Sequence, residues 1–150
     1  MTVEASPLVD IVGVGLKNGQ ILFLNLKKDS IVFSLRQKNS PTVIAFSPDS
    51  PFMATGDSTG SVILWNLEQK RIAYKMEGCM PEPIDSLLFI PGMESVLTVG
   101  SSASNSIKQL RVNFDDNKIL TLLRERVGNR QPLTSVQIAS NNDLLLKNST

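Results

Sequence analysis

Three arginines form the basic cluster of the sequence, Arg124, Arg126 and Arg130. If this stretch is a strand, Arg124 and Arg126 point to one face, where both could meet phosphate groups or an acidic protein. No aromatic residue lies close enough in the sequence to stack on bases, as single-stranded RNA binding usually requires. The other interpretation is a charged outer strand that discourages pairing with a second sheet. The sequence favours edge protection and leaves RNA contact as the alternative.

Residues for acid–base or nucleophilic catalysis are scarce. The sequence contains no histidine and one cysteine, Cys79. This excludes Ser-His-Asp and Cys-His catalysis and imidazole metal sites. Without a partner base, Cys79 is predicted to be a small buried hydrophobe in a connection between strands. We therefore expect no enzymatic activity and no small-molecule substrate.

Three short motifs resemble ligand sites but lack an essential part. The glycines of Gly13-Val14-Gly15 and Gly19 resemble a phosphate loop, but such a loop opens a helix and here a strand pattern follows. Asp115-Asp116 offers oxygen ligands without the glycine and terminal glutamate of a calcium loop, so a strand-to-strand loop is favoured. Asn148-Ser149-Thr150 matches a glycosylation sequon in a sequence without a secretory signal. We expect no cofactor and no metal.

The charge balance gives no general attraction to nucleic acid or anionic lipid. The 150 residues include 15 basic and 14 acidic side chains, a formal net charge of +1. The N-terminal residues lack the basic region of a signal peptide, and no uncharged apolar run reaches the length of a membrane helix. A soluble intracellular protein without a membrane partner is expected.

Short strands must position all of these residues. Between Thr42 and Glu68 the sequence has three apolar or β-branched runs, separated by a Ser-Pro-Asp-Ser turn and a Ser-Thr-Gly turn. A fourth run, Arg71 to Lys75, follows after five residues. Four short strands in succession, the third ending in Trp65-Asn66, are the pattern of one WD-repeat blade.

The same unit occurs earlier in the sequence at a constant offset. Six pairs of similar residues are each 41 residues apart: Gly15 and Gly56, Gly19 and Gly60, Leu24 and Trp65, Asn25 and Asn66, Leu26 and Leu67, and Phe33 and Tyr74. A looser third copy places Gly100 44 residues after Gly56. Both spacings fit the WD-repeat period. Gly19 and Gly60 are predicted to serve the turns, and Trp65 and Asn66 the end of the third strand, as structural residues.

The predicted fold is an all-β, partial WD-repeat β-propeller, with about two complete four-stranded blades and a partial blade at each end. Its predicted units are residues 1–37, a blade lacking its first strand; 42–76, a complete blade; 84–126, a complete blade; and 133–150, the start of another blade. The runs Ile21–Leu24 and Val62–Trp65 are apolar at every position, so both sheet faces must be covered, as they are by neighbouring blades. We expect a segment of a longer propeller, because a closed ring typically needs at least four blades.

Several strings resemble one family more specifically. They are VDIVGVGL at Val9–Leu16, ATG, STG and LWNLE across Ala54–Glu68, FIPG at Phe89–Gly92, SNSIKQ at Ser104–Gln109 and LLRERVGNRQPLT at Leu122–Thr134. Together they resemble the WD-repeat protein of the small-subunit processome, the Utp-twenty-one type of the U-three small nucleolar ribonucleoprotein. The first and last strings are the most specific, because a generic WD repeat does not require them.

That resemblance implies a non-enzymatic scaffold in the nucleolus that helps to assemble the small ribosomal subunit precursor and supports 18S rRNA maturation. Other WD-repeat proteins are the implied partners, and direct contact with pre-rRNA is left open. A generic WD-repeat adaptor in trafficking, ubiquitin ligation or signalling is the alternative, since the blade pattern permits it equally well.

Three positions depart from the family pattern. Asn66 replaces the aspartate of the WD pair, Asn129 stands where the family has histidine, and Gln109-Leu110 has lost the tryptophan of the third unit. These departures predict the loss of the buried hydrogen-bonded network that typically fixes a blade.

Overall fold

A computed structural model describes residues 1–7, 10–48, 50–90, 96–103 and 105–112, and the strands formed by 120–126, 133–138 and 144–148. Every regular element in these residues is a β-strand. The described part of the chain contains no helix that could span a membrane. The all-β class predicted from the sequence is confirmed.

In the residues that the structure describes, fourteen strands form four antiparallel sheets in sequence order. The first sheet contains β1 (Thr2–Ala5), β2 (Ile11–Gly15), β3 (Gln20–Asn25) and β4 (Ser30–Arg36). The second contains β5 (Pro41–Phe46), β6 (Phe52–Asp57), β7 (Val62–Asn66) and β8 (Arg71–Met76). The third contains β9 (Ser86–Phe89), β10 (Val96–Ser101), β11 (Ser106–Val112) and β12 (Leu120–Arg126), and the last contains β13 (Leu133–Ile138) and β14 (Leu144–Asn148).

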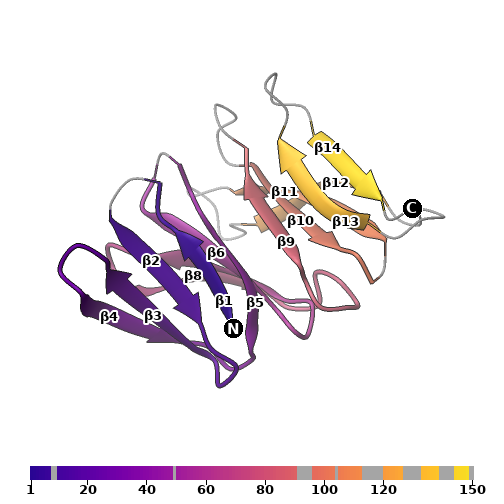
Figure 1. The fold of residues 1–150 in the computed structure, drawn as a ribbon. Helices are drawn as coiled ribbons and strands as arrows, with labels where there is room; N and C mark the ends of the chain where they lie inside the picture. The colour runs from indigo at the N-terminus through magenta and orange to yellow at the C-terminus, as the bar shows by residue number, and fades with distance from the viewer. Residues whose placement is uncertain are drawn as a thin grey trace.

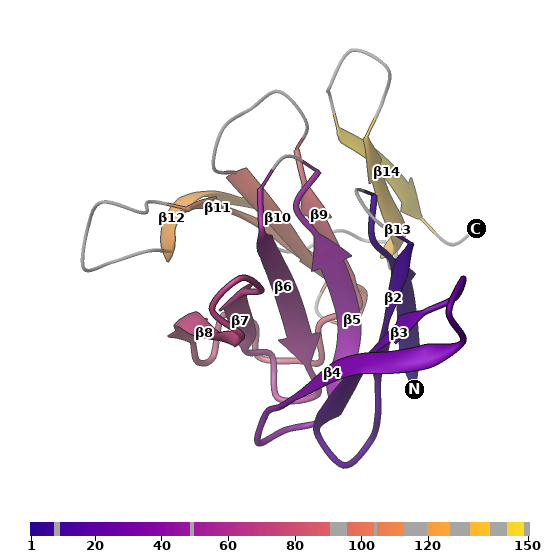
Figure 2. The same ribbon diagram turned by 90° about the vertical axis from the view of Figure 1, so that its left-hand side faces the viewer.

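The sheets follow one another around an arc, with the first strand of each sheet on the inner side (Figures 1 and 2). Each four-stranded sheet pairs its strands strictly in chain order. Strand β5 contacts both β1 and β9, and β9 contacts β13. The first strands of successive sheets therefore line the inside of the arc, and the fourth strands lie at its outer edge.

Two apolar clusters hold the first three sheets together. On β7, Val62 and Leu64 belong to the cluster between the second and third sheets, whereas Ile63 and Trp65 belong to the cluster between the first and second. This division follows from the alternation of side chains along a strand. The continuous apolar run on β7 is therefore explained by burial on both faces, as the sequence analysis predicted.

The first sheet corrects one prediction. The sequence analysis expected residues 1–37 to lack a first strand, but β1 pairs with β2 from Thr2 opposite Gly15 to Ala5 opposite Val12. Strand β1 was missed because its four residues are mostly exposed and include Glu4, so they carry no buried apolar pattern. The first unit is thus a complete four-stranded blade.

Candidate functional site

A chain of buried hydrogen bonds joins the first and second sheets. The indole Nε1 of Trp65 donates to Thr55 Oγ1 at 3.0 Å, and the Thr55 hydroxyl donates to Gln37 Oε1 at 2.9 Å. Gln37 Nε2 in turn donates to the Asn39 carbonyl at 2.9 Å. Exposures of 2% for Trp65, 0% for Thr55 and 5% for Gln37 show that water cannot replace these bonds. We call these three residues the polar relay.

The relay corrects the expectation that the buried polar network is lost. Gln37 lies in the connection from β4 to β5 and supplies both an acceptor for Thr55 and a donor for Asn39. A side-chain amide can fill this place because it carries a donor and an acceptor together. The sequence alone did not indicate Gln37, because glutamine is neither the histidine nor the aspartate of the family pattern.

The corresponding positions at the next junction are apolar. Met80, in the connection from β8 to β9, is equivalent in position to Gln37. The backbone amide of Met80 donates to the Gly60 carbonyl, and the backbone amide of Gln37 donates to the Gly19 carbonyl. Met80 is buried in one cluster with Val99 and Leu110, which lie on β10 and β11. The expected loss of the polar network therefore applies to the junction between the second and third sheets and not to the junction between the first and second.

A second polar group, Asp57, closes the turn between β6 and β7. Its Oδ1 accepts hydrogen bonds from the Thr59 amide at 2.8 Å, the Thr59 hydroxyl at 2.7 Å and the Ser61 amide at 3.1 Å. Asp57 is 1% exposed. The sequence analysis did not select it, although an aspartate just before a Ser-Thr-Gly turn is a recognisable signal for a side chain that organises a turn.

The two predicted turn glycines occupy equivalent places. Gly19 and Gly60 have φ angles of 89° and 85°, a region that side chains with a Cβ rarely adopt. Each also lies against the backbone of the next connection. An added Cβ would be 2.1 Å from the Gln37 carbonyl oxygen at Gly19, and 1.9 Å from that of Met80 at Gly60. The glycines thus allow each hairpin to contact the connection that leads to the next sheet.

Asn66 organises the turn that follows β7. Its Oδ1 accepts a hydrogen bond from the Gln69 amide at 3.1 Å, and Lys70 then adopts a φ of 54°. The first sheet repeats this arrangement, since Asn25 Oδ1 accepts from the amides of Lys27 and Lys28 at 3.0 Å each. Asparagine therefore supplies the side-chain acceptor that the aspartate of a WD pair would supply.

We expect Asn66→Asp to leave the free energy of unfolding unchanged within about 0.5 kcal/mol, because the acceptor oxygen is retained. Asn66→Ala should cost about 1 kcal/mol, the usual value of one such hydrogen bond. Denaturant unfolding of the two variants measures the difference. Equal stability of the aspartate and alanine variants would show that the Asn66 side chain does not hold the turn.

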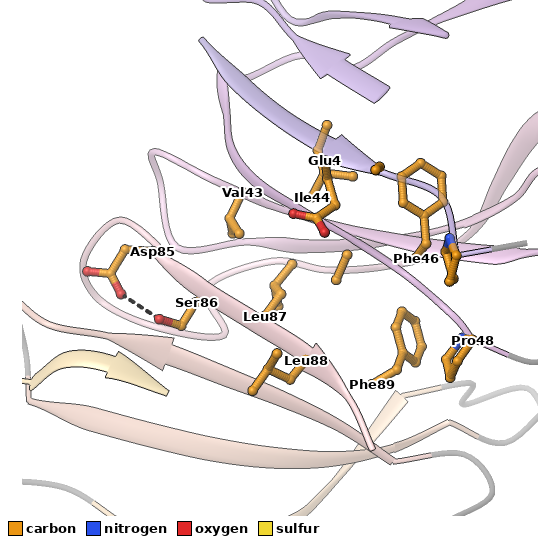
Figure 3. Close-up of a pocket in the computed structure, with 13 residues that line it drawn as sticks. Glu4, Val43, Ile44, Phe46, Pro48, Asp85, Ser86, Leu87, Leu88 and Phe89 are labelled. Atoms are coloured by element: carbon orange, nitrogen blue, oxygen red, sulfur yellow. Dashed lines mark hydrogen bonds between the residues drawn. The ribbon is translucent and has the colours of Figure 1, made fainter. Parts of the chain in front are cut away.

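A groove runs along the inside of the arc, between the first strands of three sheets (Figure 3). Its volume is about 480 Å³. Apolar side chains form most of its walls: Val43, Ile44, Phe46, Leu87, Leu88 and Phe89. Among the described residues that line it, the ionisable side chains are Glu4 from β1 and Asp85 just before β9, and none is basic. We call this space the inner groove.

The two carboxylates of the inner groove are in different states. Asp85 is held in place, because its Oδ2 accepts the Ser102 amide at 2.9 Å and a short bond from the Ser102 hydroxyl. Glu4 makes no hydrogen bond or ion pair with the other residues that the structure describes. Partial burial raises the pKa of the Glu4 carboxyl above its ordinary value. The groove thus presents one oriented acid and one acid that lacks a partner.

The remaining predicted residues lie away from the inner groove. Arg124 and Arg126 are on β12, the outer strand of the third sheet, opposite Gln109 and Ile107 of β11. Arg130, like Asp115-Asp116, lies outside the described residues. Cys79 is buried, and burial raises the pKa of its thiol while the nearby Lys108 partly opposes this shift. A raised thiol pKa means little thiolate at neutral pH, which agrees with a packing role.

Metal-ligand chemistry finds no support in the described part of the chain. No group of three or more potential ligands from histidine, cysteine, aspartate and glutamate occurs there. The surfaces that the described residues present include strand edges and the inner groove.

Successive four-stranded sheets on an arc, with the first strands inside and one junction joined through a tryptophan, a threonine and the preceding connection, define a partial WD-repeat β-propeller. Residues 1–115 match the family model described as the WDR36/Utp21 first beta-propeller. The chain belongs to this family.

Two curated relatives and one solved structure indicate the extent of the similarity. The chain is 33% identical over 143 residues to human WD repeat-containing protein 36, covering 93% of this chain and 15% of the relative. It is 26% identical over 133 residues to the Schizosaccharomyces pombe U3 small nucleolar RNA-associated protein 21 homolog, covering 88% of this chain and 14% of the relative. The chain thus spans about one seventh of the length of these relatives.

The solved structure shows the same fold at low sequence identity. Sqt1 from Chaetomium thermophilum, bound to the N-terminus of the ribosomal protein L10, superposes with a TM-score of 0.79 at 19% identity. The superposition covers 99% of this chain and 43% of Sqt1. The fourteen strands therefore correspond to somewhat less than half of that propeller chain.

Proposed function

We propose that this propeller segment is part of a non-enzymatic scaffold that assembles the precursor of the small ribosomal subunit and supports 18S rRNA maturation in the nucleolus. The observation that carries the proposal is the match of residues 1–115 to the WDR36/Utp21 first propeller. A relative's name places that protein with the U3 small nucleolar RNA. Other WD-repeat proteins of the assembly are the proposed partners.

The geometry supports a binding role for the segment. Its ordered polar groups, the relay and the Asp57 turn, are used to fix turns and junctions between sheets. The groups that remain for partners are the outer strands, the connecting turns and the inner groove. Such surfaces suit a scaffold, whose work is to hold other molecules in place.

Affinity purification of the whole tagged protein tests this proposal. We expect precursor RNA of the small subunit and other processome proteins to co-purify, and depletion of the protein to lower the level of mature 18S rRNA. Recovery of ubiquitin-ligase, trafficking or signalling components without precursor RNA would contradict the proposal and support the generic adaptor.

The arginine cluster is a separate prediction within this proposal. Because β12 is an edge strand, we expect Arg124→Glu, Arg126→Glu and Arg130→Glu together to leave RNA affinity unchanged. Titrations of the whole protein with a single-stranded RNA at several salt concentrations measure this. Had the three arginines contacted phosphates, the slope of log affinity against log salt would fall by about 2. A fall of that size would assign the RNA role to β12 and overturn the edge interpretation.

A further inference from the structure

The inner groove has the hydrogen-bonding capacity to take a peptide. Strands β1, β5 and β9 are each the terminal strand of their sheet, so each pairs on one side only. The other side of an edge strand presents unpaired N–H and C=O groups. An extended chain can pair with such an edge and place alternate side chains in the space beside it.

The groove is also chemically different at its two ends (Figure 3). Asp85 and Ser86 lie at one end, beside the start of β9, and Glu4 projects into the middle. Phe46, Phe89 and Pro48 lie together at the other end. The part of the groove with Asp85 and Glu4 therefore suits a cationic group, and the end with Phe46 and Phe89 suits an apolar side chain.

Glu4 places a negative charge in the groove without a positive charge beside it. Glu4 is an exposed residue, and no described residue gives its carboxylate a hydrogen bond or a counter-charge. Its carboxylate is therefore available to a lysine or arginine of a partner, which would form a charge-assisted hydrogen bond with it. Asp85 lies in the same groove and adds a second negative charge, held in position by Ser102.

We infer that the inner groove binds an extended segment of a partner protein that carries lysine or arginine toward Glu4 and Asp85, and an apolar side chain toward Phe46 and Phe89. Phosphate groups of RNA are disfavoured because the two ionisable side chains that the structure describes in the groove are both acidic. The inference goes beyond the proposed function, since it concerns a peptide-binding surface that would exist in any assembly.

The test is a direct binding measurement on the whole purified protein. The probe is a fluorescent, end-blocked hexapeptide with two lysines at one end and one phenylalanine at the other. Fluorescence anisotropy should show saturable binding that weakens as salt is raised. Replacing the lysines by glutamates, or the phenylalanine by glycine, should each weaken binding by about tenfold or more. A hexauridylate probe should not bind in the groove.

Protein variants locate the binding site. Glu4→Gln combined with Asp85→Asn should weaken lysine-peptide binding by about tenfold or more. Glu82→Gln is the matched control, because Glu82 is an exposed acid in the same connection as Asp85 but does not line the groove. The Glu82→Gln variant should bind the lysine peptide with the same affinity as the unmodified protein. Glu4→Gln alone leaves the Asp85–Ser102 contacts intact. Weaker peptide binding by this single variant would show that the loss of affinity in the double variant reflects the lost charge and not disturbed folding.

Three results would overturn the inference: no saturable binding of the lysine peptide, equal binding of the glutamate peptide, or undiminished binding to both groove variants. Each can occur while the protein still co-purifies with small-subunit precursor. Conversely, peptide binding can be demonstrated in vitro even if the protein belongs to another assembly. The failure of this inference is therefore distinguishable from the failure of the proposed function.

Discussion

Gly60→Ala is expected to lower the free energy of unfolding by about 4 kcal/mol or more, a loss that few single substitutions reach. Two effects add at this position. An alanine at a φ of 85° adopts a conformation disfavoured by about 1–2 kcal/mol. Its Cβ would also lie 1.9 Å from the Met80 carbonyl oxygen, so the hairpin must move away from the connection. That movement breaks the 2.9 Å bond between the Met80 amide and the Gly60 carbonyl.

Gly78→Ala separates the two effects. Gly78 also has a positive φ, 62°, but an added Cβ there meets nothing within 4 Å. This control should lose only the conformational part, about 1–2 kcal/mol. Denaturant unfolding of both variants with the same probe gives the comparison. Equal losses would show that the contact between the hairpin and the Met80 connection has no energetic importance.

Thr55→Val is expected to cost about 2–6 kcal/mol, although the two side chains are nearly the same size. The substitution removes the hydroxyl that accepts from Trp65 Nε1 and donates to Gln37 Oε1. It leaves both groups buried without a partner, each at a cost of about 1–3 kcal/mol. The free energy of unfolding, measured together with Trp65 fluorescence, reports this change.

The chain contains a control for the relay in Thr98, a buried threonine on the corresponding strand of the third sheet. Thr98 accepts a hydrogen bond from Gln109 Nε2 at 3.4 Å, near the limit of hydrogen-bonding distance. Thr98→Val should therefore cost less than about 1 kcal/mol. If it costs as much as Thr55→Val, the loss at Thr55 does not come from the relay.

A combined variant provides a further test. Gln37→Met, Thr55→Val and Trp65→Leu together reproduce the apolar set Met80, Val99 and Leu110 of the next junction. Because the three polar groups of the relay are removed together, none of them is left without its partner, and the combination should be less destabilising than the sum of its three single substitutions. Simple additivity would contradict coupling through the relay.

Repetition explains why so much of the fold could be predicted from the sequence. The 41-residue offset fixed the relation between the first two units, and the run from Arg71 to Lys75, predicted as the fourth strand of its unit, corresponds to β8 (Arg71–Met76). The sequence of β7 predicted that neighbouring sheets cover both of its faces, because an unbroken apolar run must be buried on both sides. Local patterns of this kind depend on burial and period, which the sequence carries directly.

The features that were missed depend on contacts between distant residues. Strand β1 is held by pairing with β2 and has little apolar pattern of its own. Gln37 acquires its role only when Thr55, eighteen positions later, is placed beside it. The inner groove combines Glu4 with Asp85, whose proximity follows from the arc and from no motif. Predicting any of these requires the sheets to be assembled first.

The difference between the two junctions has a consequence for how the repeats can diverge. An apolar junction such as that of Met80 tolerates exchange among side chains of similar volume, so its sequence is free to drift. The Gln37 junction demands a donor and an acceptor in fixed positions, and an unsuitable neighbour would leave Thr55 and Trp65 unsatisfied. The polar junction therefore contributes specificity, because it is satisfied only by a neighbouring blade that supplies the matching hydrogen-bonding groups. The apolar junction contributes stability without this specificity.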